Sequence, residues 1–143
     1  MALSRCLWPF LFIFFACRSG LVPEESRESV SLEAGRALYE KHCLACHQID
    51  GSGVPGFYPP LSKTEWVTGD KDRLIGILLQ GLSGKIEVKG ELYNQEMASS
   101  EFLSDEEVSA VLTYIRKSFG NHSEEVTSEE VFSMRTRLKE TAP

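Results

Sequence analysis

Hydrophobic residues recur at helical spacing in several blocks of this 143-residue chain, and polar segments separate the blocks. Apolar side chains three and four positions apart form one face of an amphipathic helix, so each block predicts a helix. Ser104 and Thr127 are each followed three residues later by glutamate, the capping-box pattern at a helix start. We expect helices from about Ser31 to residue 42, from Asp70 or Asp72 to near Gly81 or Gly84, from Ser104 to Gly120, and from Thr127 onward. The pattern therefore predicts a small all-α domain.

Two segments between these blocks depart from the helical pattern. Residues 48–60 are rich in glycine and proline, which predicts a loop. Residues 86–88 and 91–93 have strand-like composition and flank the dipeptide Lys89-Gly90. A glycine in a two-residue connection favours the tight turn of a β-hairpin, so we expect a small hairpin there.

The N-terminus has a different pattern, because residues 7–16 are almost wholly apolar. This run is far shorter than the roughly 20 residues of a membrane-spanning helix. Together with Arg5 before it, the run predicts an export signal over residues 1–16. The segment from Phe14 to Cys17 is similar to a bacterial lipobox, and this resemblance implies that Cys17 is lipidated and becomes the mature N-terminus. The alternative is ordinary cleavage between Ala16 and Gly20, which releases a soluble protein.

Composition divides the remaining chain into a tether and one domain. Residues 17–30 are rich in serine and glutamate and contain Pro23, which predicts a flexible polar tether. Residues 31–143 are long enough for a single domain. The formal net charge is −6, and an acidic surface argues against nucleic acid as a partner.

The segment Cys43-Leu44-Ala45-Cys46-His47 is the most informative motif in the chain. C-x-x-C-H is the attachment motif of c-type haem. The two thiols add across the porphyrin vinyl groups as thioethers, and the adjacent imidazole of His47 reaches the iron as a proximal ligand. Bacteria attach this haem outside the cytoplasmic membrane, which agrees with the predicted export signal. We therefore expect one covalent haem c.

Three other interpretations of this motif are open. A zinc site needs further cysteine or histidine ligands, and the chain offers only His42 and His122 besides. A thioredoxin-like dithiol needs a βαβ setting, and no parallel-strand pattern flanks the motif. Two structural cysteines leave the histidine unexplained. Since Cys6 leaves with the signal and Cys17 is the lipidation candidate, haem attachment accounts for both remaining cysteines.

The sixth iron ligand has one main candidate and two rivals. Met97 lies in the polar segment between the expected hairpin and the helix that Ser104 caps, and its thioether would raise the reduction potential. Met134 falls on the apolar face of the last expected helix, which favours a role in the core. His122 would give a bis-histidine site. We predict Met97.

At this point the chain resembles a class I monohaem cytochrome c over residues 31–140. The family has a glycine and an aromatic residue before the first haem cysteine, at the spacing of Gly35, Tyr39 and Cys43. Pro59 and Tyr114 also fall at family positions. The resemblance implies the cytochrome c fold, in which a helix passes close to the glycine. It also implies that the Pro59 carbonyl accepts the proximal imidazole N–H and orients the ring.

A narrower resemblance points to bacterial cytochrome domains that accompany periplasmic dehydrogenases or are fused to copper nitrite reductases. The matching segments are 66–70, 73–75, 81–82, 93–94, 103–105, 111–116, 119–121 and the tail 126–135. Ala98 departs from these domains, which usually have proline after the methionine. The resemblance implies redox proteins as partners, such as a dehydrogenase, an oxidase or a reductase.

The expected function is therefore one-electron transfer in the bacterial cell envelope, with the protein exported and held at the membrane by its lipid. Two alternatives differ from a free electron carrier. The chain could be a dedicated electron-accepting subunit of one periplasmic dehydrogenase. It could instead be a haem enzyme with an open sixth position, which Met97 argues against.

Overall fold

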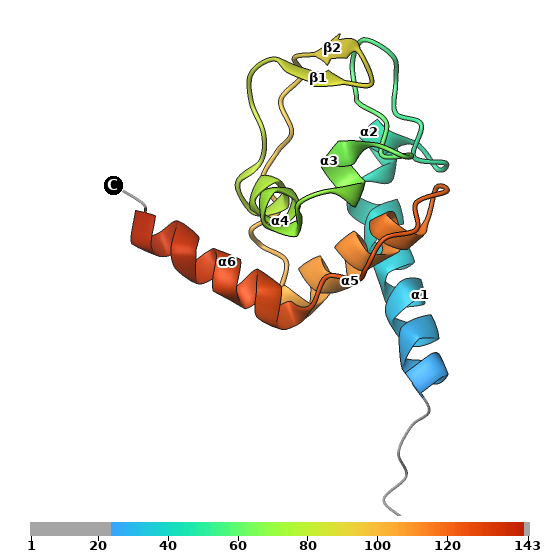
Figure 1. Ribbon diagram of the computed structural model, residues 1–143, viewed down its shortest axis with the longest axis vertical. Coiled ribbons are helices and arrows are strands. Elements are labelled where there is room, and N and C mark those ends of the chain that lie inside the picture. The colour runs from blue at the N-terminus through green and yellow to red at the C-terminus, as the bar shows by residue number, and fades with distance from the viewer. Residues whose placement is uncertain (1–23, 142–143) are drawn as a thin grey trace, which may run out of the picture.

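The computed structural model describes the backbone of residues 24–141 and the side chains of residues 31–141. The predicted export signal and Cys17 lie outside the described residues. Figure 1 shows a mainly helical chain with one short hairpin at the upper edge of the view, so the predicted helical class is confirmed. The helices are α1 (Glu24–His42), α2 (Leu44–His47), α3 (Glu65–Thr68), α4 (Lys71–Gln80), α5 (Asp105–Lys117) and α6 (Ser128–Thr141). The strands are β1 (Ile86–Val88) and β2 (Glu91–Tyr93).

Helices α1 and α5 cross closely, as Figure 1 shows. Gly35 makes this approach possible, because a Cβ atom there would lie 2.2 Å from the Ala110 carbonyl oxygen and 2.7 Å from Tyr114 Cβ. Next to the crossing, the rings of Tyr39, Tyr114 and Phe119 lie 5.1–5.7 Å apart, in the distance range of favourable aromatic pairs. The crossing and its aromatic cluster fix the end of α1 that leads into the C-x-x-C-H motif.

Two helix boundaries differ from the sequence-based expectation. Helix α1 begins at Glu24 rather than near Ser31, so it extends into the segment predicted as a tether. The added turns contain no glycine or proline and begin with two glutamates, which suit the positive end of the helix dipole. Helix α5 ends at Lys117 rather than at Gly120, because Phe119 adopts a positive φ of 57° and turns its ring toward Tyr39.

The other helix starts and the hairpin follow the local sequence signals. The capping boxes at Ser104 and Thr127 are both formed, with the expected side-chain to backbone hydrogen bonds. Asp70 caps α4 and accepts a hydrogen bond from the Arg73 amide at 2.7 Å. In the hairpin, Lys89 and Gly90 both have positive φ, as the favoured two-residue turn requires. These capped elements form the frame around the site.

Helix α6 packs across α4 and α5 rather than extending the α1–α5 pair. Val131 and Met134 are buried in the hydrophobic core, with 0% and 8% of their surface exposed. Met134 is therefore a core residue, as its position on the helix predicted. Among the helices that the structure describes, none has the length and apolar character needed to cross a membrane.

Candidate cofactor site

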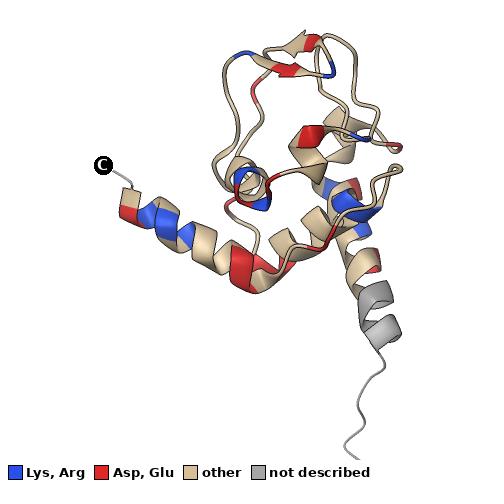
Figure 2. Cartoon of the chain, viewed as in Figure 1, with Lys and Arg blue, Asp and Glu red and all other residues tan. Residues whose placement is uncertain are grey.

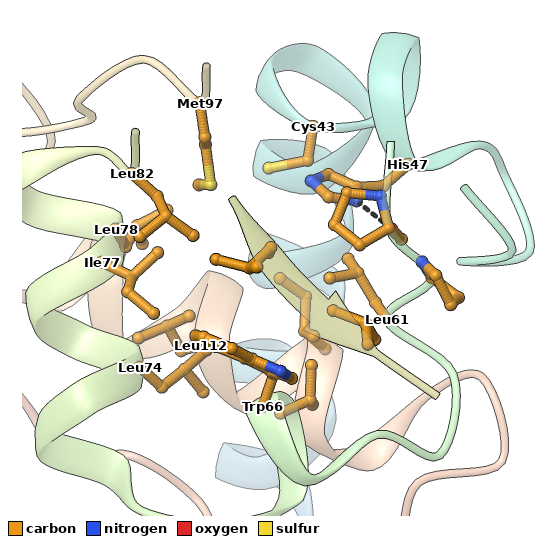
Figure 3. A pocket seen from close by; sticks show the side chains of 16 residues that line it. Cys43, His47, Leu61, Trp66, Leu74, Ile77, Leu78, Leu82, Met97 and Leu112 are labelled. Atoms are coloured by element: carbon orange, nitrogen blue, oxygen red, sulfur yellow. Dashed lines mark hydrogen bonds between the residues drawn. The ribbon is translucent and has the colours of Figure 1, made fainter. Parts of the chain in front are cut away.

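An apolar cavity lies between the C-x-x-C-H motif, α4 and the segment after the hairpin (Figure 3). Hydrophobic side chains from segments far apart in the sequence form most of its wall. The lining residues are Cys43, His47, Pro59, Pro60, Leu61, Trp66, Val67, Leu74, Ile77, Leu78, Leu82, Ile86, Val88, Met97, Leu112 and Ile115.

His47 is held in one orientation by the backbone of the following loop. Its Nδ1 lies 3.0 Å from the Pro59 carbonyl oxygen, and because a carbonyl only accepts, Nδ1 donates the proton. Burial lowers the pKa of the imidazole, and the hydrogen bond to Pro59 acts in the opposite direction without reversing the shift. The neutral ring therefore keeps its Nε2 lone pair available for a metal. The partnership expected for Pro59 is present in the structure.

The loop that presents Pro59 is folded tightly back on the motif. Gly53 donates its amide to the His47 carbonyl at 3.0 Å, and the Leu61 amide donates to the Gly51 carbonyl at 2.8 Å. Gly53 has a φ of 66°, and a Cβ atom there would lie 2.3 Å from the Tyr58 carbonyl oxygen and 2.6 Å from that of Pro59. Only glycine fits this position, so the loop geometry that orients His47 depends on Gly53.

Cys43 and Cys46 lie on one turn at the start of α2, and only Cys43 is among the residues that line the cavity. Cys46 is half-buried. Burial, followed by the neighbouring Cys46, raises the pKa of the Cys43 thiol to about 11. The thiol is therefore protonated at neutral pH, unlike the low-pKa attacking thiol of a thioredoxin-like site. This disfavours the dithiol interpretation of the motif.

Met97 reaches the same cavity from another part of the chain, as Figure 3 shows. Its backbone forms a β-bridge with Leu82, in which each residue donates its amide to the other's carbonyl with a nitrogen-to-oxygen distance of 2.9 Å. Gly81, at the end of α4, has a φ of 79°, and a Cβ atom there would lie 2.4 Å from the Met97 carbonyl oxygen. The end of α4 and the Met97 segment therefore approach each other closely only because residue 81 is glycine.

The two rival ligands lie away from the cavity. Met134 is in the core and is not among the lining residues, and its sulfur lies 3.8 Å from an Arg137 guanidinium nitrogen. His122 is exposed in the segment between α5 and α6. Cys43, His47, Pro59 and Met97 share one cavity, and the structure does not bring Met134 or His122 to it.

Several wall residues were not predicted as part of the site. Trp66 lines the cavity, donates its indole N–H to the Glu87 carbonyl at 2.9 Å, and lies beneath the Arg73 guanidinium at 4.8 Å. This bond ties α3 to the hairpin and closes one side of the cavity. Ile86 and Val88 enter the wall from the hairpin. The sequence predicted this hairpin but gave no indication of what its side chains cover.

The donor set of the cavity fits a haem better than a bare metal ion. An apolar wall suits a flat hydrophobic macrocycle, while a neutral imidazole and a thioether are known axial ligands of haem iron. Among the described residues, no group of three or more His, Cys, Asp or Glu side chains could hold a metal ion. The zinc interpretation therefore finds no ligand set in this part of the chain.

Comparison with known proteins agrees with this geometry. The family model described as cytochrome c matches residues 32–119, which is more than half of the chain. The chain belongs to the cytochrome c family. Cytochrome c-552 of Thermus thermophilus is 39% identical over 112 residues, covering 72% of this chain and 85% of that protein. Membership implies a covalently bound haem c, one-electron transfer and the cytochrome c fold.

Dehydrogenase subunits are also among the relatives, but the match covers only a small part of them. The cytochrome subunit of fructose dehydrogenase from Gluconobacter japonicus is 30% identical over 116 residues, which is 74% of this chain and 23% of that protein. The cytochrome c subunit of gluconate 2-dehydrogenase from Pantoea cypripedii is 33% identical over 109 residues, covering 72% and 24%. The haem domain is thus similar to domains that occur within larger redox subunits.

Proposed function

We propose that this protein is a one-electron carrier in which Cys43 and Cys46 bind one haem c, and His47 and Met97 are its axial ligands. The single observation that supports this assignment best is that His47 and Met97 line the same apolar cavity although they are 50 positions apart in the sequence. When bound, the haem supplies the one-electron change between ferrous and ferric iron.

The protein residues contribute orientation and a dry environment. The hydrogen bond from His47 to the Pro59 carbonyl holds the imidazole ring and increases its basicity. Pro59 would thereby influence the iron's properties through His47, without being a ligand itself. Leu74, Leu78 and Leu112 restrict water at the cavity wall, which lowers the local dielectric and influences the reduction potential. A filled sixth position leaves no site for substrate, which distinguishes an electron carrier from an open-site haem enzyme.

Absorption or EPR spectroscopy of the purified ferric protein tests this function. Two strong axial ligands predict a low-spin ferric iron, and a potentiometric titration should follow a one-electron Nernst curve. A high-spin ferric spectrum, together with rapid consumption of peroxide, would instead favour the open-site enzyme.

The proposal extends to location and partners. Export by the signal at residues 1–16, lipidation of Cys17 and residence in the bacterial cell envelope form one consistent set, since haem c is attached outside the cytoplasmic membrane. The partners are redox proteins, namely a dehydrogenase, an oxidase or a reductase. The relatives named as dehydrogenase subunits support a dehydrogenase as electron donor and leave a dedicated subunit as the second candidate. Co-purification from membranes with one stoichiometric dehydrogenase would favour the subunit, and its absence would favour the free carrier.

A further inference from the structure

Helix α6 lies beyond residues 32–119, which match the family model, yet one of its side chains reaches the segment that follows Met97. The Arg135 guanidinium donates to the Glu101 carbonyl at 3.0 Å, to the Leu103 carbonyl, and to Asp105 Oδ1 at 2.6 Å. The side chain of Arg135 is only 22% exposed and that of Asp105 is 23% exposed, so this charge-assisted pair is largely shielded from water, while the bond to the Glu101 carbonyl is exposed. Arg135 thus binds two backbone carbonyls of one turn and the first residue of α5.

The opposite side of this turn is bound to α4. The Met97 backbone pairs with Leu82, Ser99 donates its hydroxyl to the Leu79 carbonyl at 2.6 Å, and the Ser100 amide donates to the Leu78 carbonyl at 2.8 Å. Residues 97–103, which we call the ligand segment, are therefore held by α4 on one side and by Arg135 on the other.

Helix α6 provides a rigid support for Arg135, because it is itself fixed to α4. The Lys71 ammonium lies 2.9 Å from a Glu130 carboxylate oxygen, and the Arg137 guanidinium lies 2.7 Å from Asp72. Figure 2 shows the acidic start and the basic second half of α6. Ion pairs near both ends, together with the buried face, keep α6 from sliding along α4. Arg135 thus lies between the two residues of α6, Glu130 and Arg137, that form these ion pairs.

We propose that Arg135 is a positioning residue that keeps Met97 at the iron by restraining the ligand segment. This inference rests on the proposed ligation by Met97. A thioether is a neutral ligand, so its occupancy depends on how rarely the surrounding backbone moves away. Met97 is followed by Ala98, whose φ is not restricted by a ring. The hydrogen bonds from Arg135 therefore restrict the backbone of the ligand segment, which has no proline after Met97 to limit its motion.

The test compares three variants of the haem-loaded protein. Arg135→Gln removes the charge and the three-way contact, while Arg135→Lys keeps the charge but loses the planar fork. Lys139→Gln is the matched control, because it removes an exposed positive charge from the same helix without touching the ligand segment or the ion pairs that hold α6 to α4. All measurements are made well below each variant's unfolding midpoint, so that global stability does not enter.

The main readout is the rate at which added imidazole replaces Met97 on ferric iron. Arg135→Gln should react about tenfold faster than wild type, which corresponds to about 1.4 kcal/mol. This is near the lower limit for one hydrogen bond to a charged group. Hydrogen exchange at the Met97 and Ser100 amides should accelerate similarly, while exchange in the second half of α5, away from Asp105, stays unchanged. Arg135→Lys should fall between Arg135→Gln and wild type, and Lys139→Gln should match wild type.

Two different failures can be distinguished. If wild-type ferric protein shows the methionine-to-iron charge-transfer band, but Arg135→Gln and Lys139→Gln exchange imidazole at the same rate, then Arg135 is only structural and the inference is overturned. If wild type lacks that band, Met97 is not the ligand, and both the proposed ligation and the inference built on it are overturned.

Discussion

Replacing Gly35 by alanine tests the helix crossing on which the haem motif rests. The added Cβ would lie 2.2 Å from the Ala110 carbonyl oxygen and 2.7 Å from Tyr114 Cβ, and neither atom belongs to the flexible end of a side chain. Helices α1 and α5 must therefore separate. Overpacking of this kind costs about 3 kcal/mol. Alanine gains about 1 kcal/mol over glycine within a helix, so the net loss should be about 2 kcal/mol.

Gly76 provides the matched control, because it lies inside α4 and a Cβ atom there would meet nothing within 4 Å. Gly76→Ala should therefore raise the free energy of unfolding by up to about 1 kcal/mol. Urea denaturation of both ferric variants, followed by circular dichroism, gives the two values. Equal effects of the two substitutions, or a more stable Gly35→Ala protein, would refute the close crossing of α1 and α5.

Three further predictions concern the site and the N-terminus. Cys43→Ala combined with Cys46→Ala should leave no haem attached after acid-acetone extraction, together with a largely unfolded chain, and haem that survives the extraction would contradict the attachment site. Asn121→Ala should lower the free energy of unfolding by about 3 kcal/mol in urea, because the buried Asn121 side chain bonds the Lys63 amide and the Leu61 and Ile115 carbonyls, which lose their hydrogen bonds; a loss no greater than that of the exposed Asn94→Ala would argue against this role. In detergent phase separation, wild type should enter the detergent phase and Cys17→Ser should remain in water, whereas aqueous partition of both would favour simple signal cleavage.

Local signals predicted those parts of the fold that depend on neighbouring residues. The capping box at Ser104, the turn at Lys89-Gly90 and the cap at Asp70 each involve residues within a few positions of one another. Helix α3 was not predicted, because four residues are too few to show a helical period. Phe119 continues the helical spacing of α5 but leaves the helix, since contact with Tyr39 outweighs local propensity.

The sequence predicts the site residues that belong to one short motif. It predicts less well the residues that distant segments of the chain contribute to the cavity wall. The C-x-x-C-H motif predicts Cys43, Cys46 and His47 as site residues from five adjacent positions, and Cys43 and His47 line the cavity. The wall contributed by Ile86 and Leu112 depends on tertiary packing that no local spacing encodes. Asp105 and Glu130 form ion pairs with Arg135 and Lys71, which only the folded arrangement of α6 reveals.

The comparison of Met97→Ala with Met134→Ala tests the central claim most directly, because both changes remove the same chemical group. Met97→Ala should lower the reduction potential, since a thioether favours ferrous iron, and should open the iron to high-spin character or to capture by another base. Met134→Ala should leave the spectrum and potential nearly unchanged while lowering stability by about 2–5 kcal/mol, because its side chain is buried in the core. A shift in potential with Met134→Ala but not with Met97→Ala would contradict the assignment of Met97 as the iron ligand.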